Sequence, residues 1–248
     1  MAARISLALV TWFLLSSTSS AQEFKEWQSR QDLFIANFPG EPVVTNVPWE
    51  TEYGAKLQAR VYTATIRGPR TYSVTAVDYG PVEDLLKAKA KACPDQADER
   101  CTGHTSFSGA GYWKNDLRGA MLYAAKKFLV SDIKLTSIAW NYLGDQAIEA
   151  NELQFTNNKD KSRSFVTIYM HHNRLYVMQE TTPANYPPPG LFVQSMYLLE
   201  PNGRRANHER VYFNGPEIDP IELNEFQRGP NDEFGFRPGA TRGSQRKQ

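Results

Sequence analysis

Histidine side chains offer the most versatile chemistry in this sequence, since imidazole can both bind metals and transfer protons. The chain has four, His104, His171, His172 and His208, and none lies in the His-Glu-x-x-His pattern of metalloprotease helices. His171 and His172 stand at the end of a predicted strand, where neighbouring side chains point to opposite faces of a sheet. The two could share one ion only through a bulge or a turn. We therefore expect structural or turn roles and no metal site.

Cys93 and Cys101 are the only cysteines, and they enclose the polar segment Pro-Asp-Gln-Ala-Asp-Glu-Arg. In an oxidising compartment this pair most simply forms a disulfide, which on the chain-entropy model stabilises the fold by about 2.5 kcal/mol. The alternatives are a redox pair, which normally has the tighter Cys-x-x-Cys spacing, and half of a metal site, which needs further ligands. His104 follows this loop closely, so a cleft near His104 is where we would look for a small-ligand or hydrolase site.

Other patterns that could support catalysis are incomplete. Ser195 lacks the flanking glycines of a nucleophile elbow and has no assignable histidine partner. Glu149 and Glu152 are close in sequence, but their odd separation on a predicted strand points them to opposite faces. We predict no catalytic residue and no cofactor, and we lean against an enzyme.

Aromatic residues near predicted loops are the remaining candidates for a binding surface. After removal of a leader described below, 28 aromatic residues remain, and Tyr112, Trp113 and Tyr186 lie in or beside the loops 102–113 and 183–190. Aromatic side chains and proline-rich segments such as the one after Tyr186 suit protein contacts. The alternative is that these side chains pack the core and stiffen the loops. Together with His104, these three residues are our candidate binding residues.

Residues 1–21 have the layout of a secretory signal peptide, with Arg4, an apolar run from Ile5 to Leu15 and small residues before a cut near Ala21. The run is 11 residues long, whereas a helix that crosses a bilayer needs about 20. We therefore expect a periplasmic or secreted protein without a transmembrane anchor. The remaining chain has 27 basic and 27 acidic residues, and this balance argues against nucleic-acid binding.

The elements that must position these residues follow from hydrophobic periodicity and turn residues. Residues 22–213 predict a single α+β domain, with an antiparallel sheet of about six to seven strands flanked by helices. Residues 214–248 contain nine Gly or Pro and predict a flexible tail. The expected strands are 33–38, 57–66, 72–79, 135–143, 146–155, 164–171, 175–181 and 210–213, and the expected helices are 81–93, 115–128 and 191–199.

Several motifs resemble those of uncharacterised exported proteins of alphaproteobacteria, over about residues 33–213. More distantly, the turn at 38–42, the hairpins and the last predicted helix are similar to PsbP-like domains. That resemblance implies an αβα sandwich around an antiparallel sheet and a role as an accessory or assembly factor, and it assigns no functional residue. The motifs are Phe38-Pro39-Gly40-Glu41-Pro42, Tyr72 to Tyr79, Asp116 to Met121, Asn173 to Val177 and Pro187 to Ser195.

The sequence thus favours a non-enzymatic binding or accessory protein that contacts another protein through a sheet edge or through the loops 102–113 and 183–190. The alternative is a small-ligand binder or hydrolase with a cleft near His104.

Overall fold

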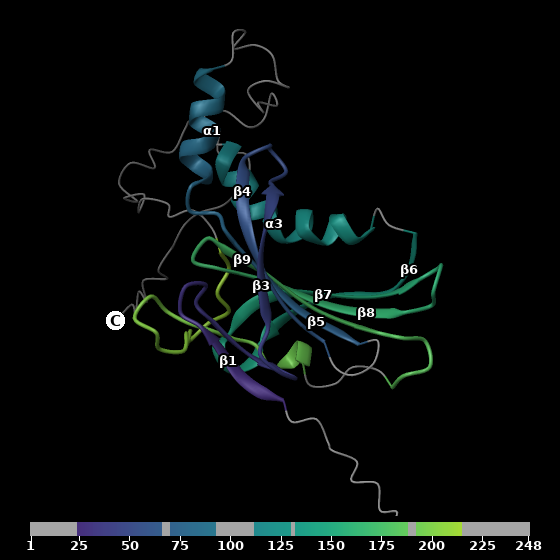
Figure 1. Cartoon of the computed structure of the whole chain (residues 1–248). Coiled ribbons are helices and arrows are strands. Elements are labelled where there is room, and N and C mark those ends of the chain that lie inside the picture. The colour runs from purple at the N-terminus through teal and green to yellow at the C-terminus, as the bar shows by residue number, and fades with distance from the viewer. Residues whose placement is uncertain (1–23, 66–69, 93–111, 130–131, 188–191, 215–248) are drawn as a thin grey trace, which may run out of the picture. The chain divides into compact units, whose positions relative to one another are not determined.

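A seven-stranded antiparallel sheet organises the computed structural model of this chain (Figure 1). The structure describes residues 24–65, 70–92, 112–129, 132–187 and 192–214, all within one unit, Met1–Gly215. The strands follow the order β3-β4-β5-β9-β8-β7-β6. Their bounds are β3 Val43–Glu50, β4 Lys56–Thr65, β5 Thr71–Asp78, β6 Ile133–Leu143, β7 Ile148–Asn157, β8 Arg163–His171 and β9 Arg174–Thr182.

The central strands are buried on both faces, as the apolar residues at successive positions of the 164–171 segment predict. In β8, Val166, Ile168 and Met170 enter one apolar core, and Tyr169 enters a second core on the opposite face. Because side chains alternate along a strand, one sheet divides the interior into two layers of core.

Two helices cover the first face of the sheet (Figure 1). α1 spans Val82–Lys91 and α3 spans Tyr112–Leu129. Leu86 of α1 and Ala120 and Ala124 of α3 are buried in the core between the helices and the sheet. Acidic residues in the first turn of α1 and lysines in its last turn complement the helix dipole.

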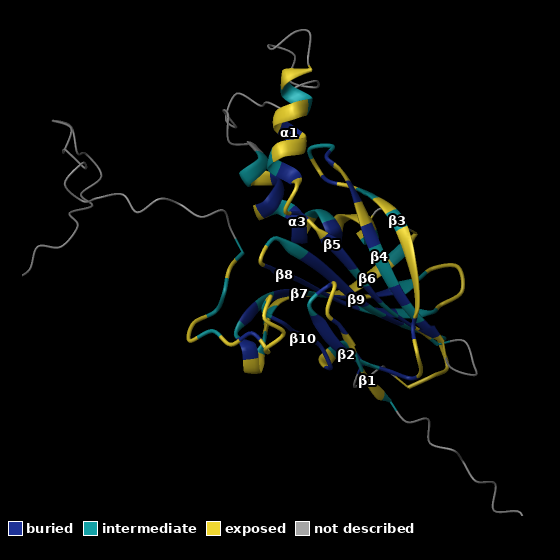
Figure 2. Ribbon diagram, turned by 60° about the vertical axis from the view of Figure 1, so that its left-hand side comes forward, coloured by how far each residue is buried: buried dark blue, intermediate teal, exposed yellow. Residues whose placement is uncertain are grey.

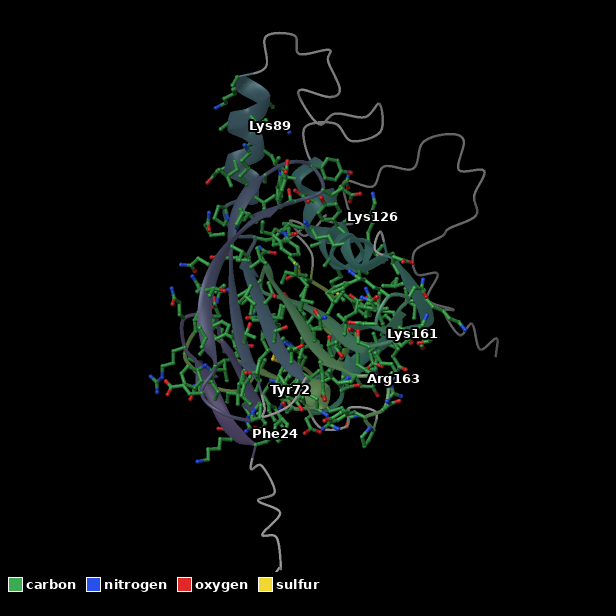
Figure 3. All side chains as sticks on the ribbon, turned by 45° about the vertical axis from the view of Figure 1, so that its right-hand side comes forward. Phe24, Tyr72, Lys89, Lys126, Lys161 and Arg163 are labelled. Atoms are coloured by element: carbon green, nitrogen blue, oxygen red, sulfur yellow. The ribbon has the colours of Figure 1, made fainter. Side chains whose placement is uncertain are left out.

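A small three-stranded sheet, and not a further helix, lies over the second face. It has the order β1-β2-β10, with β1 at Lys25–Ser29, β2 at Phe34–Phe38 and β10 at Tyr197–Leu198. Phe38 contacts Phe192 with ring centroids 5.2 Å apart, and Phe24 meets Tyr72 edge-on at 5.5 Å (Figure 3). These packed aromatic side chains form the second core. In the described residues the layers are therefore helices, large sheet and small sheet.

The α+β class is confirmed, and the flanking helices that we expected on both faces are found on one. The predicted helix over 191–199 is wrong, because its described residues form a 3₁₀ turn at Phe192–Gln194 followed by β10. Buried Ser195 stabilises this turn by donating to the Phe192 carbonyl at 2.8 Å. The predicted edge strand over 210–213 is reduced to a single parallel bridge between Ile148 and Tyr212.

The start of α3 also differs from the prediction. The helix predicted over 115–128 begins three residues earlier, at Tyr112, and Asp116 is a buried residue inside it that accepts a hydrogen bond from the Thr51 hydroxyl at 2.5 Å. A Cβ at Gly119 would meet only the Glu52 carboxylate, at 3.2 Å, and this is the end of an exposed, flexible side chain that can move away. Prediction also missed β1 and β3, the latter because Pro48 is unusual inside a strand.

Burial differs sharply between the inner and outer strands (Figure 2). β8 and β9 are mostly buried, whereas β6 has no buried residue along its length. None of the described helices is long and apolar enough to cross a membrane.

Candidate functional site

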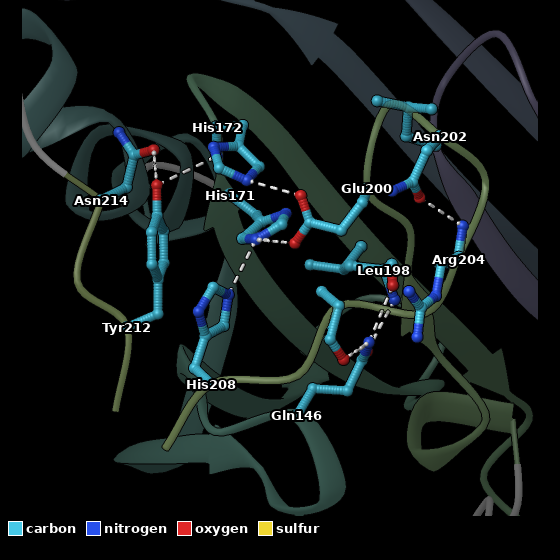
Figure 4. Close-up of polar contacts among 12 residues, drawn as sticks. Gln146, His171, His172, Leu198, Glu200, Asn202, Arg204, His208, Tyr212 and Asn214 are labelled. Atoms are coloured by element: carbon cyan, nitrogen blue, oxygen red, sulfur yellow. Dashed lines mark hydrogen bonds and ion pairs between the residues drawn. The ribbon is translucent and has the colours of Figure 1, made fainter. Parts of the chain in front are cut away.

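Three of the four histidines gather beside the turn that joins β8 to β9 (Figure 4). β8 ends at His171, β9 begins at Arg174, and the two residues between them both have left-handed backbone conformations, with φ of 47° at His172 and 57° at Asn173. Two consecutive positive φ values are the signature of a type I′ hairpin turn, for which asparagine is well suited. The local sequence therefore dictates a tight reversal at this point.

The turn removes the geometric objection to a shared site for His171 and His172. Because His172 leaves the alternation of the strand, its ring lies beside that of His171, with the centroids 4.1 Å apart. The structural or turn roles expected from the sequence describe how the two residues are placed. They do not account for what the imidazoles face.

Residues that follow β10 bring a carboxylate and a third imidazole to the same place. Gln146, which is 1% exposed, donates to the carbonyls of Leu198 and Ala206 at 2.7 Å each and accepts from the Leu198 N–H at 2.7 Å. This one side chain thereby holds both arms of the turn that carries Glu200. His208 lies two residues beyond Ala206.

Tyr212 anchors the far end of the same segment. Its N–H donates to Ala147 O at 2.6 Å and its carbonyl accepts from Glu149 N at 3.1 Å, which ties it to the start of β7. The ring stacks on His208 at 4.7 Å and meets His171 edge-on at 4.8 Å. The Tyr212 hydroxyl accepts a hydrogen bond from the backbone N–H of His172 at 3.3 Å, so the tyrosine contacts all three histidines.

The polar atoms of the cluster converge on one point. His171 Nε2 lies 3.1 Å from His208 Nε2 and 3.7 Å from Glu200 Oε1, and His172 Nε2 lies 2.9 Å from Glu200 Oε2. One ligand atom from each of His171, Glu200 and His208 lies within 4.8 Å of the others. We refer to His171, His172, Glu200 and His208 as the histidine cluster.

Burial and charge make His171 a neutral imidazole. Its side chain is 2% exposed, and burial, together with the neighbouring His172 and His208, lowers its pKa to about 3. The contact between His171 Nε2 and His208 Nε2 then needs a hydrogen on one nitrogen and a lone pair on the other. Neutral imidazole nitrogen and carboxylate oxygen are the donor types that bind divalent transition metals.

The sequence alone does not reveal the cluster. The tight turn was detectable from alternating strands that flank His-Asn, but Glu200 and His208 follow His171 by 29 and 37 positions and belong to irregular backbone. Their approach depends on the contacts of Gln146 and Tyr212, which leave no periodic signal in the sequence.

The residues that the sequence singled out do not meet at this cluster. His104, Cys93 and Cys101 lie outside the described residues. Tyr112 is the first residue of α3, and Trp113 is partly buried against the core under the helices, with Lys114 Nζ 5.5 Å from its ring centroid.

Tyr186 lies elsewhere, with 41% of its surface exposed. The Arg70 guanidinium is 5.2 Å from its ring centroid, and Arg163 donates to its carbonyl. Two hollows of about 280 and 170 Å³ in the described part lie along β7 and β8, and no histidine lines either.

An exposed apolar stripe on β6 is the second feature that could act in binding. Leu135, Ile138, Trp140 and Tyr142 are 39%, 57%, 54% and 45% exposed. The first two pair with the core residues Phe155 and Leu153 of β7, so the stripe lies on the helix-covered face of the sheet, and a register shift between Leu135 and Ser137 keeps the four on that face. We call these four residues the β6 stripe.

Pairing differs between the two edges of the large sheet. β6 contains no proline, and no described strand pairs with its outer side. β3, at the opposite edge, contains Pro48, which has no N–H to offer to an incoming strand. Of the two, β6 is therefore the better template for strand addition.

Comparison with known proteins assigns neither feature a role, because no protein-family model matches this sequence and no curated protein matches it.

Proposed function

We propose that this chain is an exported, non-enzymatic binding or accessory protein that contacts a protein partner through β6. The observation that carries the proposal is the β6 stripe beside an unpaired strand edge. β6 is 11 residues long, and the four side chains of the β6 stripe lie on one face of the sheet.

The edge and the stripe suit one kind of partner, an extended protein segment. The unpaired N–H and C=O groups of an edge strand can bind another strand through main-chain hydrogen bonds, and side-chain contacts then supply specificity. An extended segment with apolar residues at alternate positions would continue the sheet and cover the stripe. Trp140 is already oriented, because its Nε1 donates to Glu149 Oε1 at 3.2 Å and its ring lies 5.9 Å from that of Tyr142.

The sequence supports the exported setting of this proposal. The leader pattern over residues 1–21 and the cysteine pair Cys93 and Cys101 both suit the periplasm or the exterior, although both lie outside the described residues. The similarity to PsbP-like domains favours an accessory or assembly role.

Site-specific photocrosslinking in the intact periplasm tests the proposal. A photoreactive residue placed at Tyr142 of a tagged mature chain should capture a defined partner protein, and the same residue placed at Leu122 should not. Leu122 is a matched control because it is an apolar side chain, 67% exposed, on α3. The Tyr142 adduct should disappear when Ile138→Lys and Trp140→Lys are added.

Three outcomes would contradict the proposal. These are an equal yield from both positions, an adduct that survives the lysine substitutions, and an adduct that consists only of a second copy of this chain. The last outcome would make β6 a self-association edge. Circular dichroism of the purified variants, which should match wild type, checks that the substitutions leave the fold intact.

A further inference from the structure

We propose that His171, Glu200 and His208 form a binding site for a divalent transition-metal ion, and that Zn²⁺ is the ion that best fits these donors. The site is independent of the proposed protein contact, since none of its residues belongs to β6.

Two of the three distances between the ligand atoms are close to those around a bound zinc ion. Tetrahedral zinc, with bonds of about 2.0–2.1 Å to nitrogen and oxygen, separates its ligand atoms by about 3.3 Å. His171 Nε2 lies 3.1 Å from His208 Nε2 and 3.7 Å from Glu200 Oε1, which brackets that separation. The three ligand atoms lie within 4.8 Å of one another, so the side chains must move closer together to share one ion.

The charge balance also favours a cation. The Glu200 carboxylate is 27% exposed and faces His171 and His172, and among the described residues no lysine or arginine pairs with it. Its negative charge thus lies next to the imidazoles of His171 and His172. An ion bound between His171, His208 and Glu200 would neutralise the carboxylate and occupy the lone pairs of both imidazoles.

The ligands are held in position before any ion binds. His171 ends a central strand, and Gln146 and Tyr212 secure the segment that carries Glu200 and His208. His172 Nε2 bonds to Glu200 Oε2 at 2.9 Å, and this bond directs the other carboxylate oxygen toward His171. We assign His172 as a positioning residue, because groups bonded to metal ligands orient them and raise affinity.

The donor set argues against the common hard cations. Mg²⁺ and Ca²⁺ prefer sites made wholly of oxygen ligands, whereas two imidazole nitrogens and one carboxylate oxygen suit Zn²⁺, Co²⁺, Ni²⁺ or Cu²⁺. Three protein ligands leave one position of a tetrahedron for water.

Metal titration of the purified mature chain, residues 22–248 after treatment with a chelator, tests the site. Co²⁺ should bind with one ion per chain and give the visible absorption of a tetrahedral complex, and Zn²⁺ should displace it. Mg²⁺ at the same concentration should neither bind nor compete. Absence of stoichiometric Co²⁺ and Zn²⁺ binding would overturn the proposal.

Ligand variants separate this site from adventitious binding. Glu200→Gln and His208→Ala should each weaken Zn²⁺ binding by more than about 100-fold, which exceeds the usual effect of removing a supporting residue. Glu209→Gln, which changes an exposed acid in the same segment, should leave affinity unchanged. An equal loss in this control, or no loss in the ligand variants, would contradict the assignment.

His172→Ala tests the positioning role. The variant should bind one Zn²⁺ about 10- to 100-fold more weakly and keep the tetrahedral Co²⁺ spectrum. Unchanged affinity would show that the bond between His172 and Glu200 does not support the site.

Discussion

Two polar clusters in this molecule, one around Asp32 and one around His171, differ in how completely their hydrogen-bonding groups are used. The Asp32 carboxylate, which is 1% exposed, accepts bonds from Arg60 Nε at 2.5 Å, from Arg60 Nη2 and from the Tyr62 hydroxyl at 2.6 Å. Its backbone carbonyl accepts from the Tyr176 hydroxyl at 2.7 Å, and its N–H donates to Ser29 Oγ at 3.1 Å. The cluster contains its own counter-charge.

The histidine cluster has no such internal balance. The Nε2 atoms of His171 and His208 face each other. The Glu200 carboxylate faces imidazoles and, among the described residues, no permanently charged partner. When the charges and lone pairs of a polar cluster are all paired with other residues of the cluster, no group is left to bind an ion from solution. Such a cluster serves stability. A cluster of ligand atoms without a counter-charge is suited to an ion from solution.

Removal of the Asp32 carboxylate should have the largest effect on stability. Asp32→Ala leaves the Arg60 guanidinium and the Tyr62 hydroxyl without their buried acceptor, and we expect a loss of about 3 kcal/mol in the free energy of unfolding. Urea denaturation measures it. Asp145→Ala, which removes an exposed acid, should change stability by less than about 0.5 kcal/mol. Comparable losses in the two variants would show that the Asp32 cluster contributes no more to stability than an exposed acid does.

Zinc should act through the other cluster. At a free Zn²⁺ concentration 100 times Kd, the free energy of unfolding of the wild-type chain should rise by about 2.7 kcal/mol, because the ion binds only the folded state. Thermal denaturation with and without the ion would show the effect as a higher Tm. In His208→Ala the rise should vanish, whereas in Asp32→Ala it should persist on a lower baseline. A rise that survives the loss of His208 would place the ion elsewhere.

Glu180 is a further buried polar residue, and its contribution to the free energy of unfolding should depend on pH. Its side chain is 2% exposed, one carboxylate oxygen has no described partner, and burial raises its pKa to about 7 despite the nearby Arg70. Since the pKa is higher in the folded state, the protonated form favours folding. That contribution is complete below the unfolded pKa of about 4.5 and is lost as the pH rises through 7.

Glu180→Gln should therefore be more stable than wild type at pH 8, by about 2 kcal/mol, and should lose that advantage toward pH 4.5. Urea denaturation at pH 5 and pH 8 provides the measurement, with Glu209→Gln as the exposed control. Parallel pH profiles for wild type and Glu180→Gln would show that Glu180 does not titrate in this range.

Trp140→Lys should have the smallest effect on the isolated protein. The side chain is 54% exposed, so its replacement should change the free energy of unfolding by less than about 0.5 kcal/mol, although we expect it to weaken partner capture at β6. Urea denaturation of the purified variant is the test. A loss above about 2 kcal/mol would mean that Trp140 is part of the packed structure and that the β6 stripe is not a free surface.

The sequence by itself determined the central architecture. Alternating apolar residues and two- to five-residue turns predict β4, β5, β7, β8 and β9 close to their observed bounds, and the residues after Gly80-Pro81 predict α1. These elements follow from local periodicity and capping, which are properties of neighbouring residues. The burial of β8 on both of its faces was detectable for the same reason.

Tertiary structure alone decided the second covering layer and the histidine cluster. β10 has only two residues, and its partners in β2 lie more than 150 positions earlier in the chain. No local pattern in the sequence therefore marks β10 as a strand. Glu200 and His208 reach His171 because Gln146 and Tyr212 fix an irregular segment against the start of β7. Contacts between residues this far apart depend on how the whole chain packs, and periodicity within a window of sequence does not contain that information.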